Sequence, residues 1–109
     1  MTEAGYTLTV TPGDVDDAPA VVAVTGEIDI TNASDFAGSV EEIPSTRPTI
    51  LDFSDVRYLD SAGFAALSDI LAARKAAIVI PVSSPVRRAA ALMSLPHHAT
   101  VDAARDALA

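Results

Sequence analysis

The chain has 109 residues and no cysteine, and half of its residues are hydrophobic, which suits one domain with a single core and no disulfides. Acidic residues outnumber basic ones by 15 to 7, and the net charge of −8 argues against a nucleic-acid binder or a protein that docks on an anionic membrane. The start lacks the features of a signal peptide, and no segment reaches the ~20 apolar residues of a membrane span. We therefore expect a cytoplasmic protein, one domain over residues 1–109 that is a monomer when free.

The first half of the chain predicts a pair of strands and then a helix. Residues 6–11 alternate between polar and apolar types that favour strands, and the continuous apolar run at 20–25 indicates a more buried strand. Turn-forming residues at 12–19 join the two, so we expect antiparallel pairing. Asp29 or Thr31 can cap the helix that follows. The apolar face of this helix consists of Ala33, Phe36, Ala37, Val40 and Ile43.

Strands alternate with helices in the rest of the chain. Such alternation implies helical crossovers and parallel strands in the middle of the sheet. We expect an α/β fold in which a small mixed β-sheet of four to five strands is flanked by about four helices. The expected elements are a strand at 49–53, a helix at 62–74, a strand at 77–82, a helix from the Ser84 cap and Pro85 to about Leu95, a short strand at 99–101 and a helix at 102–108.

The most informative motif is an Asp-Ser-x-Gly at 60–63, which opens a helix after a buried strand and a short turn. The first backbone N–H groups of a helix are unpaired and its dipole is positive there, so a phosphate on Ser61 would be stabilised. Asp60 and Ser61 are also ordinary N-cap residues, and a simple capping role stays open. Gly63 costs about 1 kcal/mol relative to Ala within a helix, which indicates a close approach to the backbone at this point.

Enzymatic and metal-binding roles fit the sequence poorly. A nucleophile elbow needs Gly-x-Ser-x-Gly, and Leu59 stands at the first Gly position. His97 and His98 are adjacent, with no cysteine or nearby acid to complete a metal site. Arg87 and Arg88 indicate a solvated face, where Arg88 could pair with an acid. No Gly-rich phosphate loop is present, so we expect no catalytic residue, no metal and no cofactor.

Three segments resemble motifs of the STAS domain family (sulfate transporter and anti-sigma factor antagonist). The first comprises residues 52–56 and 59–64, with the Asp-Ser-x-Gly. The second is Val22–Asp29, which is similar to a Gly-Glu-Leu-Asp at the end of a strand, and the third is Ser83–Arg88, which is similar to Ser-Pro-x-Val-Arg-Arg. They keep the family order, and the chain most resembles the stand-alone bacterial anti-sigma factor antagonists. The resemblance implies the STAS fold.

The resemblance also implies a non-enzymatic regulator with a phosphorylation switch at Ser61. The unphosphorylated protein would bind an anti-sigma factor that is also a serine kinase of the GHKL type, and so release a sigma factor for transcription. Phosphorylation of Ser61 would dissociate the complex until a phosphatase removes the phosphate. Asp29, Asp60 and Ser61 are expected to be neighbours, because strand ends that lead into helices gather on one side of such a sheet. The partner-binding residues would be Glu27, Asp29, Asp60, Ser61, Ala62, Gly63 and Phe64.

The chain departs from the family pattern at four places, and two other functions stay open. The helix before Arg74 reaches the next strand quickly, and Phe64 replaces a usual Leu. Ser94 stands where a Gly is usual, and the Pro of the Ser-Pro-x-Val-Arg-Arg motif is displaced by one position. One alternative is a docking subunit of a transporter, such as a lipid-transport ATP-binding cassette complex, without a phosphate cycle. The other is a sensor that binds a small molecule or nucleotide at the helix N-terminus.

Overall fold

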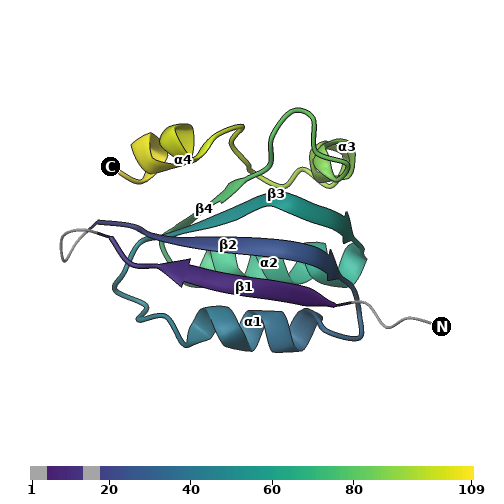
Figure 1. Cartoon of the computed structure of the whole chain (residues 1–109), viewed down its shortest axis with the longest axis horizontal. Coiled ribbons are helices and arrows are strands. Elements are labelled where there is room, and N and C mark those ends of the chain that lie inside the picture. The colour runs from purple at the N-terminus through teal and green to yellow at the C-terminus, as the bar shows by residue number, and fades with distance from the viewer. Residues whose placement is uncertain (1–4, 14–17) are drawn as a thin grey trace.

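The computed structural model describes residues 5–13 and 18–109, so the turn expected at 12–19 lies partly outside the described residues. One sheet contains, in spatial order, β1 (Tyr6–Thr11), β2 (Ala20–Ile28), β3 (Thr49–Leu59) and β4 (Ala76–Val79), as Figure 1 shows. β1 is antiparallel to β2, whereas β2, β3 and β4 are parallel. The helices are α1 (Ala33–Glu41), α2 (Ser61–Ala73), α3 (Arg87–Leu92) and α4 (Val101–Leu108). The predicted α/β fold with a small mixed sheet is confirmed.

Helices cover both faces of the sheet and create two hydrophobic clusters. The larger cluster joins α1, α2 and α3 to one face and includes the fully buried Phe36 and Leu67. Within it, the ring of Phe36 makes edge-to-face contacts with Tyr6 and Phe53 at centroid distances of 5.8 and 5.9 Å. On the opposite face, α4 packs Ala104 and its other buried residues against β3 and β4. Of the apolar face predicted for the first helix, all but Ala37 therefore lies in the main core, and Ala37 is half-buried at a groove between α1 and α2.

β3 extends to Leu59, beyond the predicted strand at 49–53, and its pairing with β2 contains two irregularities. At the first, Asp52 Oδ1 accepts hydrogen bonds from the backbone N and Oγ of Ser54, at 3.0 and 2.5 Å. Each extra residue in a bulge shifts the inside–outside alternation of a strand. Two consecutive residues are consequently exposed at 54–55 and again at 57–58. The polar types in this segment suggested a turn, but they belong to a bulged strand.

The predicted caps of the first helix are wrong, because Asp29 and Thr31 are used in a turn before α1 begins. Asp29 Oδ1 accepts hydrogen bonds from the N and Oγ1 of Thr31, at 2.8 and 2.5 Å. The N-cap position is occupied by Asn32. The side chain of Asn32 closes the turn instead of capping the helix, since Oδ1 accepts from Asp29 N and Nδ2 donates to Glu27 O, both at 3.0 Å.

β4 and α3 are both shorter than predicted. β4 ends at Val79, which also forms one parallel bridge to His98, and this bridge replaces the short strand expected at 99–101. Ser84 does not cap α3, because its Oγ accepts from Val86 N at 3.2 Å and the helix begins only at Arg87. Residues 5–13 and 18–109 thus contain four strands and a single bridge, within the predicted four to five.

Arg74 fastens the ends of α1 and α2 to the strand between them. Desolvation by burial lowers the pKa of its guanidinium, which remains charged because arginine does not deprotonate in proteins. The short connection between α2 and β4 that the sequence shows therefore contains the arginine that links α1, α2 and β3. The guanidinium donates hydrogen bonds to the carbonyl oxygens of Val40, Ile43, Pro44 and Arg47 and to Thr49 Oγ1, at 3.0, 3.1, 2.8, 3.2 and 3.0 Å.

Gly26 and Gly38 form a matched pair for a test of backbone strain. Gly26 has φ of 95°, and a Cβ there would lie 2.3 Å from Gly5 O, so we expect Gly26→Ala to lower the free energy of unfolding by about 2 kcal/mol or more. Gly38 lies in α1 with open space around it, so Gly38→Ala should raise the same quantity by about 0.5–1 kcal/mol. Urea denaturation measures both values. Effects of the same sign would contradict this description of the two positions.

Candidate partner-binding site at the start of α2

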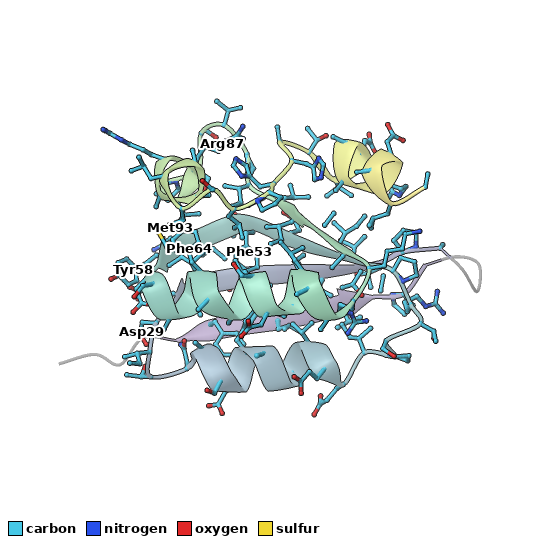
Figure 2. All side chains as sticks on the ribbon, turned by 180° about the vertical axis from the view of Figure 1, so that it is seen from behind. Asp29, Phe53, Tyr58, Phe64, Arg87 and Met93 are labelled. Carbon is cyan, nitrogen blue, oxygen red and sulfur yellow. The ribbon has the colours of Figure 1, made fainter. Side chains whose placement is uncertain are left out.

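The candidate site lies at one end of the sheet, where β2 and β3 finish and α2 begins (Figure 1). It comprises residues 27–30 and 58–64, and we refer to these as the site. Figure 2 shows Asp29, Tyr58 and Phe64 together at this end of the molecule. Parallel pairing of β2 with β3 aligns Ile28 with Leu59, so the loop after β2 reaches the start of α2.

Asp60 ties the β2–α1 loop to the start of α2. Its Oδ1 accepts a hydrogen bond from Gly63 N at 3.1 Å, which caps the helix, and its Oδ2 accepts from Ile30 N at 3.3 Å. The backbone N of Asp60 also donates to Ile28 O at 3.3 Å. One carboxylate therefore serves as the N-cap and as the anchor of the neighbouring loop. Asp29 lies in that loop, so the structure brings Asp29, Asp60 and Ser61 into one neighbourhood, as the parallel topology predicts.

Ser61 is the first residue of α2, and its side chain is exposed. Among residues 5–13 and 18–109, no side chain or backbone group makes a hydrogen bond with Ser61 Oγ. The sequence left a capping role for Ser61 open, and the structure gives that role to Asp60 instead. The hydroxyl is consequently free to react with another molecule. It also lies where the positive end of the helix dipole favours a negative charge.

Gly63 and Phe64 are buried, although the sequence places them among the partner-binding residues. A Cβ at Gly63 would lie 2.3 Å from Leu59 Cδ1 and 3.3 Å from Ile28 O. The close approach expected at this glycine is therefore made by the ends of β2 and β3 themselves. The side chain of Phe64 is only 5% exposed and belongs to the main core. Both residues position the start of α2 and have almost no surface for a partner.

The remaining predicted residues offer different amounts of surface. Glu27 is exposed on β2 and lines a shallow hollow with Asp55 and Arg57. Asp29 is half-buried, and one of its carboxylate oxygens is engaged by Thr31. Ala62 is half-buried at a groove of about 440 Å³ between α1 and α2. Glu27, Asp29, Asp60 and Ala62 therefore retain exposed surface, unlike Gly63 and Phe64.

Sequence reasoning missed the exposed apolar residues of this end. Ile30 is 81% exposed, Tyr58 is 49% exposed, and Met93, which follows α3, is 53% exposed. Ile30 interrupts a run of polar residues, and that isolated apolar position in a turn was the one available signal. The exposure of Tyr58 follows from the bulges of β3, which no single-strand pattern reveals.

Comparison with known proteins identifies the family. The model of the family described as "Mlab, STAS domain" matches residues 14–103. The chain belongs to the STAS domain family. The predicted resemblance to this family is thereby confirmed, while comparison with curated proteins finds no match.

Two solved structures are similar to this STAS domain. One is an anti-sigma factor antagonist from Mycobacterium paratuberculosis, with a TM-score of 0.81 and 25% identity over 95% of this chain and 94% of that chain. The other is the STAS domain of an antisigma-factor antagonist from Rhodobacter sphaeroides, with a TM-score of 0.57 and 15% identity over 88% of this chain and 96% of that chain. The second likeness concerns the fold alone.

Other polar groups that the sequence singled out have local roles in the STAS domain. Arg87 donates to Ile80 O at 2.7 Å, and His97 Nδ1 lies 2.7 Å from Leu95 O. Arg88 is exposed and, within the described part of the chain, forms no ion pair with an acid. Across residues 5–13 and 18–109, no group of three His, Cys, Asp or Glu side chains could hold a metal ion. In the same ranges, no helix has the length and apolar character needed to cross a membrane.

Replacement of Asp60 tests the double role of its carboxylate. Asp60→Ala removes the cap of α2, which contributes about 1 kcal/mol, and the hydrogen bond to Ile30 N, which contributes about 1 kcal/mol more. We expect the free energy of unfolding to fall by about 1–2 kcal/mol, and amide exchange at Ile30 and Gly63 to accelerate. Asp69→Ala is the control, because Asp69 is an exposed acid of the same helix without a hydrogen bond in the described structure. Equal effects of the two substitutions on the free energy of unfolding would contradict the double role of the Asp60 carboxylate.

Proposed function

We propose that this STAS domain is an anti-sigma factor antagonist that is switched by phosphorylation of Ser61. The observation that carries the proposal is the exposed hydroxyl of Ser61 at the first position of α2, which has no structural task because Asp60 supplies the cap. The likeness to the mycobacterial anti-sigma factor antagonist, which extends over both chains almost completely, supports this role. In this proposal the protein is a cytoplasmic binding protein and catalyses no reaction itself.

The proposed partner is an anti-sigma factor that is also a GHKL-type serine kinase. The unphosphorylated STAS domain occupies this partner, and the sigma factor that the partner held is released to direct transcription. In the complex, Ser61 Oγ attacks the γ-phosphorus of ATP bound to the kinase. The bond between this phosphorus and the oxygen that bridges it to the β-phosphate breaks, ADP leaves, and a base on the kinase takes the serine proton. A phosphatase later hydrolyses the phosphoserine.

The phosphate acts as a charge placed on a rigid surface. It adds about −1.5 to −2 charges at pH 7. Locally, the unpaired N–H groups and the dipole of α2 stabilise it, so the STAS domain does not need to refold. A partner seated over Ser61, however, meets new charge beside Asp29 and Asp60 on a chain of net charge −8. Repulsion and the cost of desolvating the phosphate then weaken the complex.

Phosphate mapping tests whether Ser61 is the acceptor. The purified protein is incubated with ATP and an extract of its own host, and its peptides are analysed by mass spectrometry. We expect phosphate on Ser61 and none in the Ser61→Ala variant. A protein that stays unmodified with extracts of both stressed and unstressed cells contradicts the proposal. That result would favour a docking subunit of a lipid-transport ATP-binding cassette complex, which needs no phosphate cycle.

Charge substitutions test how the switch works. Ser61→Ala should bind the purified kinase as the wild type does, whereas Ser61→Asp should bind at least about tenfold more weakly because of like-charge repulsion at the interface. Ser68→Asp is the matched control, since Ser68 is an exposed serine of the same helix away from its first turn. Isothermal titration calorimetry measures the affinities of the wild type and the three variants. Equal affinities of Ser61→Ala and Ser61→Asp would contradict a charge switch.

A further inference from the structure

Three of the six exposed large apolar side chains of the described residues lie at the end of the molecule that carries the site. Ile30 directly follows β2, Tyr58 is the last residue but one of β3, and Met93 directly follows α3. Figure 2 shows Tyr58 and Met93 at the same end of the molecule as Phe64 and Asp29, and Figure 1 shows that β3 ends and α2 begins at this end. We call Ile30, Tyr58 and Met93 the apolar patch. The exposed large hydrophobic residues of the described structure are Val10, Ile30, Tyr58, Val82, Leu92 and Met93, at 41, 81, 49, 74, 75 and 53%.

The second bulge of β3 turns Tyr58 outward. In a regular strand, residues two apart share a face, so Tyr58 would lie on the buried side with Val56. The pairing with β2 instead advances from Val56 opposite Gly26 to Tyr58 opposite Glu27, which leaves Arg57 as an extra residue. Val56 is fully buried, whereas Tyr58 is half exposed. Bulges commonly redirect a side chain next to a functional site, and this one presents an aromatic ring three residues before Ser61.

The other two members of the apolar patch are also held in place. The backbone N of Ile30 donates to Asp60 Oδ2, so the carboxylate that caps α2 also fixes the loop that exposes Ile30. Met93 is the C-cap residue of α3, and its backbone N donates to Ala89 O at 2.9 Å. Ser94, with φ of 56°, then ends the helix. Three separate elements therefore present apolar side chains on ordered backbone, which reduces the entropy that binding must remove.

We propose that Ile30, Tyr58 and Met93 anchor the serine kinase that phosphorylates Ser61, and this inference rests on the proposed function. Phosphoryl transfer requires the γ-phosphorus of ATP to come within about 3–3.5 Å of Ser61 Oγ. A kinase surface that reaches Ser61 also meets Ile30, whose backbone N is bonded to Asp60, and Tyr58, which lies near the end of β3 just before Ser61. Met93 lies at the same end of the molecule. Aromatic residues and Met are enriched in the buried centres of interfaces, and polar groups form the rim. The exposed Arg57 and the half-buried Asp29 supply such a rim here.

The apolar patch and the phosphate have separate tasks in this scheme. The patch is unchanged by phosphorylation, so it sets the affinity of the complex, and the charge on Ser61 sets the difference between the two states. None of the three side chains takes part in the phosphoryl transfer. Their replacement should consequently raise the KM of the kinase for the STAS domain and leave kcat nearly unchanged.

Initial rates of Ser61 phosphorylation test the inference on the full chain. The kinase activity is a fraction of host extract supplied with ATP, and the STAS domain is varied in concentration. For the double variant Ile30→Ser/Tyr58→Ser and for Met93→Ser we expect a KM at least about tenfold and about threefold higher, respectively, with kcat within about twofold of wild type. Val10→Ser is the matched control, because Val10 is 41% exposed on β1 and pairs with Val22 near the opposite end of β2. Its KM should equal that of the wild type.

A second readout uses the STAS domain as a competitor. An excess of Ser61→Ala should inhibit phosphorylation of the wild type, and Ser61→Ala/Tyr58→Ser should inhibit at least about fivefold less effectively. Urea denaturation checks that all variants fold, since exposed substitutions usually change stability by less than about 0.5 kcal/mol. Wild-type phosphorylation with unchanged KM and inhibition in the patch variants would overturn the inference and leave the proposed function intact. Absence of phosphate on wild-type Ser61 would overturn both.

Discussion

The two hydrogen bonds of the Asp60 carboxylate determine the geometry around Ser61. One bond caps α2 at Gly63 N, and the other holds Ile30 N in the loop after β2. Hydrogen bonds to an ionised acceptor are stronger than those between neutral groups, so one side chain fastens two elements. Because Asp60 caps the helix, the hydroxyl of Ser61 remains free. In the proposed function, structural support falls to Asp60 and modification to Ser61, so that phosphate can be added without removing the cap.

The close approach of strand ends to α2 depends on a second constraint, which is the absence of a side chain at Gly63. Leu59 and the carbonyl of Ile28 occupy the space that a Cβ would need. The bulges of β3 complete the surface, because they expose Tyr58 just before the chain enters α2. Short-range packing and strand irregularity together place a free hydroxyl and an aromatic ring at the same end of a rigid sheet.

Periodicity predicted the elements whose burial is regular. The helical spacing of Phe36 and Val40 was sufficient for α1, and both residues lie in the core. The strand at 49–53 was too short because Asp52 and Ser54 have turn-forming side chains, and only pairing with β2 shows that they form a bulge. The caps proposed for α1 failed for a related reason, since several polar residues in succession can cap a helix and tertiary contacts select among them.

The Asp-Ser-x-Gly motif located Ser61 and Asp60 from the sequence, because helix-start chemistry is local. The exposure of Ile30 depends on the hydrogen bond from its backbone N to Asp60, and that of Tyr58 depends on the register between β2 and β3. Neither can be read from a short stretch of sequence. Amide chemical shifts of the Ser61-phosphorylated and unphosphorylated protein test the central claim, that the phosphate acts as a charge on a rigid site. The account predicts shift changes confined to residues 27–30, 58–64 and their immediate neighbours. Changes that extend through β1 and α4 would show that phosphorylation rearranges the fold, and would contradict it.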